Sequence, residues 1–110
     1  MRTLILTIAL ILVSLPLLGG EMCVVKTKAD ADVIVYVTEN QWEAHLWVCT
    51  TDIGTYAQHS DSYWKFVNYK NGQTVKVYFT KSKYEADIII SYSQYQHGWR
   101  KPNQFQGRLH

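Results

Sequence analysis

The sequence predicts an all-β domain of about six strand-plus-loop units, each thirteen residues long. One phrase occurs twice, because "VYVTENQWEA" (35–44) and "VYFTKSKYEA" (77–86) share five of ten residues. Alanines recur thirteen residues apart at Ala31, Ala44 and Ala57, and a fixed internal period is the signature of a repeat architecture. Apolar and polar residues alternate within the units, which is typical of half-buried strands. Together these observations favour one compact body of equivalent β units.

The first twenty residues have the pattern of an export signal. A short cationic start precedes an apolar stretch, residues 4–18, which contains Pro16 and is followed by two glycines. This order of regions is typical of a cleaved signal peptide, so we expect residues 1–20 to form a signal helix and the protein to be secreted or periplasmic. The alternative is a membrane anchor through residues 4–18. That stretch is short for a bilayer span, which needs about 20 apolar residues.

Each unit has seven strand-like residues followed by six polar ones. The expected strand ends are Val25, Thr38, Thr51, Val67, Thr80 and Ser93. Three extra residues, somewhere between Gln58 and Val67, break the period. Alternation assigns one buried face, which in chain order collects Val33, Val35, Val37; Leu46, Val48, Thr50; Trp64, Phe66; Val75, Val77, Phe79; and Ile88, Ile90, Tyr92. The opposite face is mixed and becomes more polar late in the chain, so we expect it to be only partly buried.

The connections between strands are short. "ENQWEA" and "KSKYEA" could each make a single helical turn, and Asn71-Gly72 is a strong turn dipeptide. Six residues suit a hairpin or an arch between packed sheets, but are too few for the usual crossover between parallel neighbours. Aromatic residues inside the connections, Trp42, Tyr56, Tyr84 and Tyr95, are predicted to pack over the strand layer; the alternative is that they, in particular Trp42, Tyr84 and Tyr95, bind a ligand.

Charge is distributed unevenly along the chain. Residues 21–64 carry seven acidic and two basic residues, whereas residues 65–110 carry eight basic and two acidic residues. If the two halves interleave in the fold, opposite charges meet and neutralise. No basic cluster is dense enough to indicate a nucleic-acid interface.

The spacing and motifs resemble one known family. The matching segments are "ADADVIVYVTENQWEAHLWV" (29–48), "YWKFV" (63–67), "VKVYFTKSKYEADIII" (75–90) and "YQHGWR" (95–100). They are similar to the 7(1) septoil knot domain family, which implies a compact, knotted domain over residues 21–99, followed here by a basic polar C-terminal tail, residues 100–110. The family has no established activity and no catalytic residues to transfer. Its units usually carry Ala-Asp where this chain has Ala44-His45, Ala57-Gln58 and Gln73-Thr74.

The two cysteines could form a disulfide in an exported protein. Cys23 and Cys49 share one phase of the repeat and should face the same side. Units placed in sequence order would separate them by about 9.6 Å, whereas a disulfide needs Cα atoms within about 7 Å. The bridge is therefore possible only if units one and three lie side by side, and the sequence leaves this open.

No set of residues in the sequence points to a particular reaction. We therefore expect no catalytic residues, no cofactor site and no metal site. Glu43 and Glu85 occupy equivalent positions and could meet as an acid–base pair, but a repeated turn residue explains them more simply. The four histidines lack the spacing of a zinc site. His59 could touch a metal together with Asp52 and Asp61, although a solvated loop is favoured.

The first hypothesis is an exported, monomeric, non-enzymatic domain that resists degradation and displays a binding surface to an unknown partner. The second is a small secreted enzyme or enzyme inhibitor that uses Glu43, Glu85 or a loop histidine. A third is glycan binding through exposed aromatic residues. Contact with a membrane is expected only through the signal segment, and the basic tail would attach weakly to an anionic surface.

Overall fold

The computed structural model describes residues 21–58, 60–70 and 74–110. The predicted signal segment and the Asn71-Gly72 turn lie outside these residues. The strands are β1 (Glu21–Val24), β2 (Val33–Val37), β3 (Leu46–Thr50), β4 (Tyr63–Val67), β5 (Val75–Phe79), β6 (Ile88–Tyr92) and β7 (Gly98–Trp99). The connections contain the 3-10 turns η1 (Lys28–Asp30), η2 (Gln41–Glu43) and η3 (Lys83–Glu85) and one short helix, α2 (Gly54–Gln58). The predicted all-β architecture, with single turns in "ENQWEA" and "KSKYEA", is confirmed.

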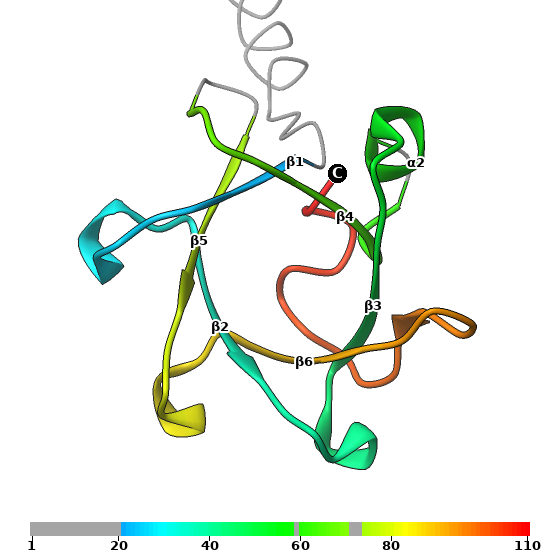
Figure 1. Cartoon of the computed structure of the whole chain (residues 1–110). Helices are drawn as coiled ribbons and strands as arrows, with labels where there is room; N and C mark the ends of the chain where they lie inside the picture. Colours follow the sequence, from blue (N-terminus) through cyan, green and yellow to red (C-terminus); the bar gives the residue numbers. More distant parts are fainter. Residues whose placement is uncertain (1–20, 59, 71–73) are drawn as a thin grey trace, which may run out of the picture.

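The first six strands close into a barrel in which neighbouring strands run parallel. Around the barrel the order is β4, β1, β5, β2, β6, β3, and a pairing between β3 and β4 completes the ring. Strands β1, β2 and β3 therefore occupy every second place, and β4, β5 and β6 fill the places between them. The chain passes around the barrel and then interleaves with itself (Figure 1).

The strand register explains how short connections can join parallel strands. Val77 in β5 pairs with Val24, at the end of β1, and also with Val33, at the start of β2. The end of one strand and the start of the next thus flank the same residue, and the connection only has to cross one intervening strand. The turn η1 lies against β5, η3 against β2 and η2 against β6. The expectation of hairpins or arches is wrong, because it treated consecutive units as neighbours.

The connection between β3 and β4 differs from the others. These two strands are consecutive in the chain and adjacent in the barrel, so residues 51–62 must make an ordinary parallel crossover. Such a crossover takes a dozen or more residues and usually contains a helix, and here it contains α2. The three extra residues in the sequence period fall in this region, where the chain changes from the first set of places to the second.

The barrel interior is formed by the face that alternation predicted. Its fully buried side chains are Met22, Val33, Val35, Leu46, Val48, Trp64, Val75, Val77, Ile88 and Ile90. The outward positions between them, such as Ile34, Tyr36 and Lys76, are half-buried. Because side chains along a strand alternate between two faces, the hydrophobic pattern is sufficient to decide which face turns inward.

Equivalent positions in the units make equivalent contacts. The hydroxyl oxygens of Thr38, Thr51 and Thr80 each accept the backbone N–H two residues further on, at 3.0–3.1 Å. The carboxylates of Asp32 and Asp87, which directly precede β2 and β6, each accept a backbone N–H of a neighbouring strand at 2.9 and 2.8 Å. The Thr and Ala-Asp positions of the pattern thus fix the end and the start of successive strands.

Interleaving also brings the two differently charged halves of the chain together. Four lysine–carboxylate pairs join residues 21–64 to residues 65–110, namely Lys28–Glu85, Lys65–Glu21, Lys76–Asp32 and Lys83–Glu43. The structure therefore confirms that the opposite charges of the two halves of the chain neutralise each other. Partly exposed pairs of this kind contribute little each, and the hydrophobic core supplies most of the stability.

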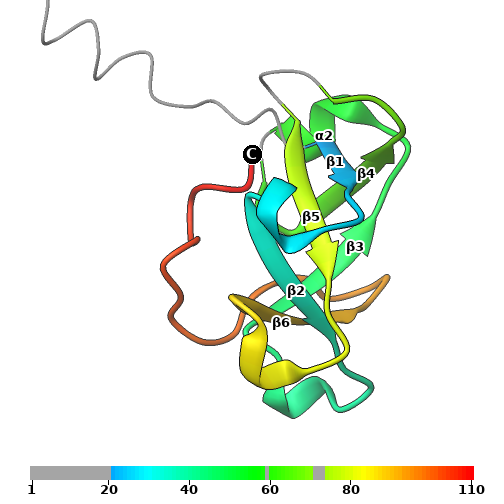
Figure 2. The ribbon, with the colours of Figure 1, turned by 90° about the vertical axis from the view of Figure 1, so that its left-hand side faces the viewer.

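Residues 100–110, here called the closing segment, fold over the end of the barrel at which the parallel strands begin (Figure 2). Trp99, just before this segment, pairs with Leu46 in an antiparallel bridge. Leu109 is fully buried and belongs to the core, and Phe105 packs against it. The predicted basic polar tail is thus anchored to the barrel by one leucine and several backbone hydrogen bonds.

Candidate functional site: the open mouth of the barrel

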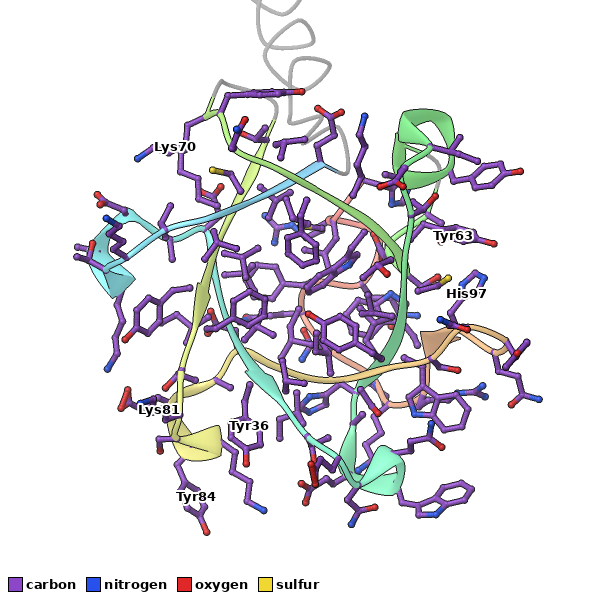
Figure 3. All side chains as sticks on the ribbon, in the orientation of Figure 1. Tyr36, Tyr63, Lys70, Lys81, Tyr84 and His97 are labelled. Atoms are coloured by element: carbon purple, nitrogen blue, oxygen red, sulfur yellow. The ribbon has the colours of Figure 1, made fainter. Side chains whose placement is uncertain are left out.

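The two ends of the barrel differ. At the amino end the closing segment covers the core, as described above. At the carboxyl end, the last inward-facing residues of the strands form a layer that we call the open mouth: Val24, Val37, Thr50, Phe66, Phe79 and Tyr92. Each follows a fully buried residue of the same strand by two positions, so its side chain is on the same, inner face. Figure 3 looks onto this end of the barrel.

The open mouth leaves apolar surface in contact with solvent. Val24 is 52% exposed and Tyr92 is 43% exposed, and Val37 and Phe66 are also exposed. The rings of Phe66 and Phe79 lie 6.2 Å apart, and Phe66 meets the buried Trp64 edge to face at 6.1 Å. A contiguous apolar patch at a barrel end is more informative than single exposed residues, because soluble monomers seldom leave such patches without a function.

Hollows surround the open mouth. One of about 600 Å³ is lined mainly by Tyr36, Val37, Phe79 and Tyr92. Another, of about 550 Å³, runs from Val37 and Tyr92 to Trp42. The first hollow has mainly apolar walls with a few polar groups at the edge, which is the composition of small-ligand sites. The second is more polar, because Thr38, Glu39, Asn40, Gln41 and Ser91 also line it. Both hollows include Tyr92, which is therefore central to the site.

The electrostatics of the mouth fit an apolar ligand. Burial raises the pKa of the Tyr92 phenol above its ordinary value of 10.0, because a phenolate would lose its hydration there. Tyr92 thus remains a neutral donor and acceptor through the physiological range. Lys81 and Glu39 provide charges of both signs at the edges of these hollows.

Of the aromatic residues that the sequence singled out, Tyr56 lies against Tyr63 of β4, with ring centroids 5.2 Å apart, whereas the other three are largely exposed. Trp42 is 80% exposed, Tyr84 is 93% exposed and Tyr95 is 92% exposed. Trp42 touches Trp47 edge to face, with ring centroids 6.2 Å apart, and lines a hollow beside the mouth. Tyr84 points away from the barrel (Figure 3). The packing interpretation is wrong for these three residues because their turns cross the outside of the strands and carry their aromatic rings outward.

Glu43 and Glu85 are held in separate ion pairs. Glu43 accepts the hydroxyl of Thr38 at 2.5 Å and the ammonium of Lys83 at 3.2 Å. These two hydrogen bonds, in that order, hold the pKa of Glu43 below its ordinary value of 4.5. Glu85 is paired with Lys28. A carboxylate with a lowered pKa is a poor general acid, and these contacts stabilise neighbouring turns.

The described histidines lie in different surroundings. His45 accepts a backbone N–H at the start of a strand, and His97 hydrogen-bonds Ser62 at 2.6 Å and lies against the ring of Tyr63 at 4.2 Å. His110 contacts Asp61. His59 lies outside the described residues, so the suggested contact with Asp52 and Asp61 is not described. Among the described residues, no three His, Cys, Asp or Glu side chains are grouped to hold a metal ion.

Cys23 and Cys49 are free thiols, so the possible disulfide is not formed. The physical reason is the strand order. Interleaving does occur, but it places β4 between β1 and β3, so units one and three are not side by side. Cys23 is buried and Cys49 is half-buried on the outer surface.

Sequence reasoning did not recognise the open mouth as a site. Apart from Val24, its residues were assigned to the buried face, together with their neighbours two positions earlier. One signal was available in the sequence. The inward positions of β3 and β6 are aliphatic except for the last one of each strand, which is Thr50 or Tyr92. That signal gains meaning only when the strands are known to be parallel, because parallel strands gather all their last residues at one end.

Comparisons with known proteins identify a family. A family model described as the 7(1) septoil knot domain matches residues 19–100. No match is found among curated proteins or among solved structures. Within the described part of the chain there is no helix long and apolar enough to cross a bilayer.

Proposed function

The chain belongs to the 7(1) septoil knot domain family, and from that premise we propose that it is an exported, non-enzymatic domain that binds an apolar or aromatic group at its open mouth. One observation carries this proposal. The closing segment covers one end of the barrel core, whereas the apolar layer at the other end is uncovered. The separation of Glu43 from Glu85 into lysine pairs favours a binding role over acid–base chemistry.

The proposed ligand group is an aromatic ring or a short aliphatic chain. The hollow between Tyr36, Val37, Phe79 and Tyr92 has room for one ring at about 600 Å³, and ring-to-ring contacts add to the gain from burying apolar area. The polar edges would orient a ligand that also carries a hydrogen-bonding or charged group. Such a site fixes one group firmly and leaves the rest of the partner in solvent.

Resistance to degradation is the second part of the proposal. A wound chain in which strands from the two halves interleave cannot release one strand without disturbing others, so local opening should be slow. The pattern of residues 1–20 supports export, where such resistance is useful. Digestion of the purified protein by a nonspecific protease tests this part. Rapid cleavage within the described barrel under native conditions would contradict it.

Binding is tested with 1-anilinonaphthalene-8-sulfonate, an aromatic sulfonate, added to the purified, isotope-labelled protein. We expect amide shift changes centred on Val37, Phe79 and Tyr92. Tyr92→Ser should weaken binding about tenfold, which corresponds to about 1.4 kcal/mol. Tyr84→Ser is the matched control, because Tyr84 lies on a turn and points away from the barrel.

Two outcomes would overturn this site. The first is no saturable shift at the mouth. The second is equal weakening by the Tyr84 and Tyr92 variants, which would move the site to the exposed aromatic residues of the turns. A titration with oligosaccharides then becomes the relevant experiment, because exposed rings on turns suit glycan stacking.

A further inference from the structure

The closing segment is held at the amino end of the barrel like a bound peptide. Its one fully buried side chain is Leu109, which enters the core. Phe105 packs partly against the same core, and the turn at Gly107 has a positive φ of 81° that favours glycine. After β7 the segment contains no strand, so it adds no ladder of paired backbone groups to the barrel.

Asp61 is the anchor of this segment. Its carboxylate accepts the indole N–H of Trp99 at 2.8 Å, the backbone N–H of Leu109 at 2.9 Å and the imidazole Nδ1 of His110 at 2.7 Å. The backbone N–H of Gly107 is a fourth donor. Asp61 is almost completely buried, and hydrogen bonds to a buried carboxylate are among the stronger ones. Two of the four donors are backbone groups, which any peptide can supply.

A short hinge joins the closing segment to the barrel. The backbone N–H groups of Arg100 and Lys101 both donate to the carbonyl of His45, at 2.7 and 3.2 Å. Pro102 follows, and the side-chain amide of Asn103 donates to the carbonyl of Asp87 at 2.9 Å. Short hinge loops are places where two copies of a chain can exchange equivalent segments. The family match ends at residue 100, so the hinge also marks the limit of the matched domain.

We propose that the amino end of the barrel is an exchangeable peptide site, filled here by residues 105–110 of the same chain and able to take those residues from a second copy. The site requires an apolar side chain in the place of Leu109, and backbone N–H groups in the places of Gly107 and Leu109, directed at Asp61. Reciprocal exchange gives a closed two-fold dimer in which each copy completes the core of the other. This site is at the opposite end of the barrel from the open mouth.

The tether favours the intramolecular arrangement at ordinary concentrations. A short linker holds its segment at an effective concentration in the millimolar range, so a second copy competes only when the segment of the same chain is weakened. This makes exchange measurable by complementation. Leu109→Asp removes the apolar group from the segment but leaves Asp61 intact, and Asp61→Asn removes the anchor but leaves the segment intact.

The experiment mixes the two full-length variants. The Asp61→Asn chain supplies a normal segment, and the Leu109→Asp chain supplies a normal site, so a mixture contains one intact pair. We expect a 1:1 complex by analytical ultracentrifugation at concentrations at which each variant alone stays monomeric. A fluorescent peptide of residues 101–110 should bind the Leu109→Asp chain at least tenfold more tightly than it binds the wild type or an Asp61→Asn/Leu109→Asp chain.

Each outcome decides the question. If either variant alone is unfolded, mixing should restore its dispersed NMR spectrum, and failure to do so would overturn the proposal. Equal binding of the peptide with and without Asp61 would also overturn it, because the anchor would then be irrelevant. A complex that forms equally well when both chains carry Leu109→Asp would point to another interface and reject exchange of this segment.

Discussion

His45 accepts the backbone N–H of Ile89 through its imidazole Nδ1 at 2.9 Å. This is the role that the carboxylates of Asp32 and Asp87 have at the starts of their own strands. Ala44-His45 departs from the family's Ala-Asp pattern but keeps the same hydrogen bond, since a neutral imidazole replaces a carboxylate as the acceptor. Burial of the ring and, secondarily, the charge of Lys101 lower the pKa of His45, which keeps Nδ1 free to accept.

The first prediction concerns pH. Because the pKa of folded His45 lies below its ordinary value of 6.5, the unfolded chain binds more protons as the pH falls below 6.5. The contribution of His45 to the free energy of unfolding is complete above pH 6.5. It decreases as the pH falls from 6.5 to the pKa of His45 in the folded protein. Urea unfolding of the wild type and of His45→Asn, which keeps an acceptor that does not titrate, should diverge between pH 8 and pH 5.5. Parallel pH profiles would contradict this role.

The second prediction concerns Asp61. Burial alone would raise the pKa of Asp61, but the donors Trp99, His110, Gly107 and Leu109 outweigh it and hold the pKa below its ordinary value of 3.8. The stabilisation is therefore present above pH 3.8 and is lost as the pH falls through the folded value. Asp61→Asn should cost about 2–3 kcal/mol at neutral pH, because it leaves buried donors poorly matched.

Hydrogen exchange provides the local readout for Asp61. The amide of Leu109 should exchange faster in the Asp61→Asn variant, whereas the amide of Val35, in the middle of the barrel, should change less. Asp52→Asn is the control, since Asp52 is an exposed carboxylate in the same connection. Unchanged protection of Leu109 in the Asp61 variant would show that the carboxylate does not anchor the closing segment.

The third prediction concerns the core. Trp64 is fully buried in the barrel, and its indole N–H donates to the carbonyl of Asp61 at 2.7 Å. Trp64→Ala should cost about 3–5 kcal/mol, from lost burial and the cavity left behind. Tyr84→Ala removes a ring that is almost fully exposed and should change the free energy of unfolding by less than about 0.5 kcal/mol. Similar losses in the two variants would contradict the assigned inner and outer faces.

The fourth prediction concerns the thiols. Cys49 is half-buried on the outer surface and Cys23 is buried, so a thiol reagent should label Cys49 rapidly in the native protein. Cys23 should react only when the barrel opens. Mass spectrometry after timed labelling with iodoacetamide measures both rates. Finding a Cys23–Cys49 bridge in protein purified without reductant would require β1 and β3 to approach each other and would contradict the strand order.

The face of each strand could be predicted from sequence, and the strand order could not. Val75 and Val77 alternate with the more polar Lys76 and Tyr78, so a single burial rule assigns them to the core. The alternation rule does not predict which strands are neighbours in the barrel. The units are so similar that one strand could take the position of another. The place of Val77 between Val24 and Val33 depends on the winding of the whole chain.

The closing segment shows a second limit. Its composition is polar and basic, which predicts a polar tail, yet Leu109 completes the core. A single apolar residue produces no periodic signal in a sequence. The partner of the segment, Asp61, lies almost fifty residues earlier, in the connection before β4. Such a contact depends on the closed barrel and cannot be derived from local pattern.

The interleaved strand order has a consequence for how the chain acquires its structure. In the sheet that the described residues form, β1, β2 and β3 have no partner among themselves. A nascent chain ending at Thr50 thus contains three strands and no place for them to pair. Apart from the β3–β4 crossover, parallel pairing joins residues more than forty positions apart. Such a high contact order predicts slow, all-or-none folding, and no half of the barrel should be able to fold by itself.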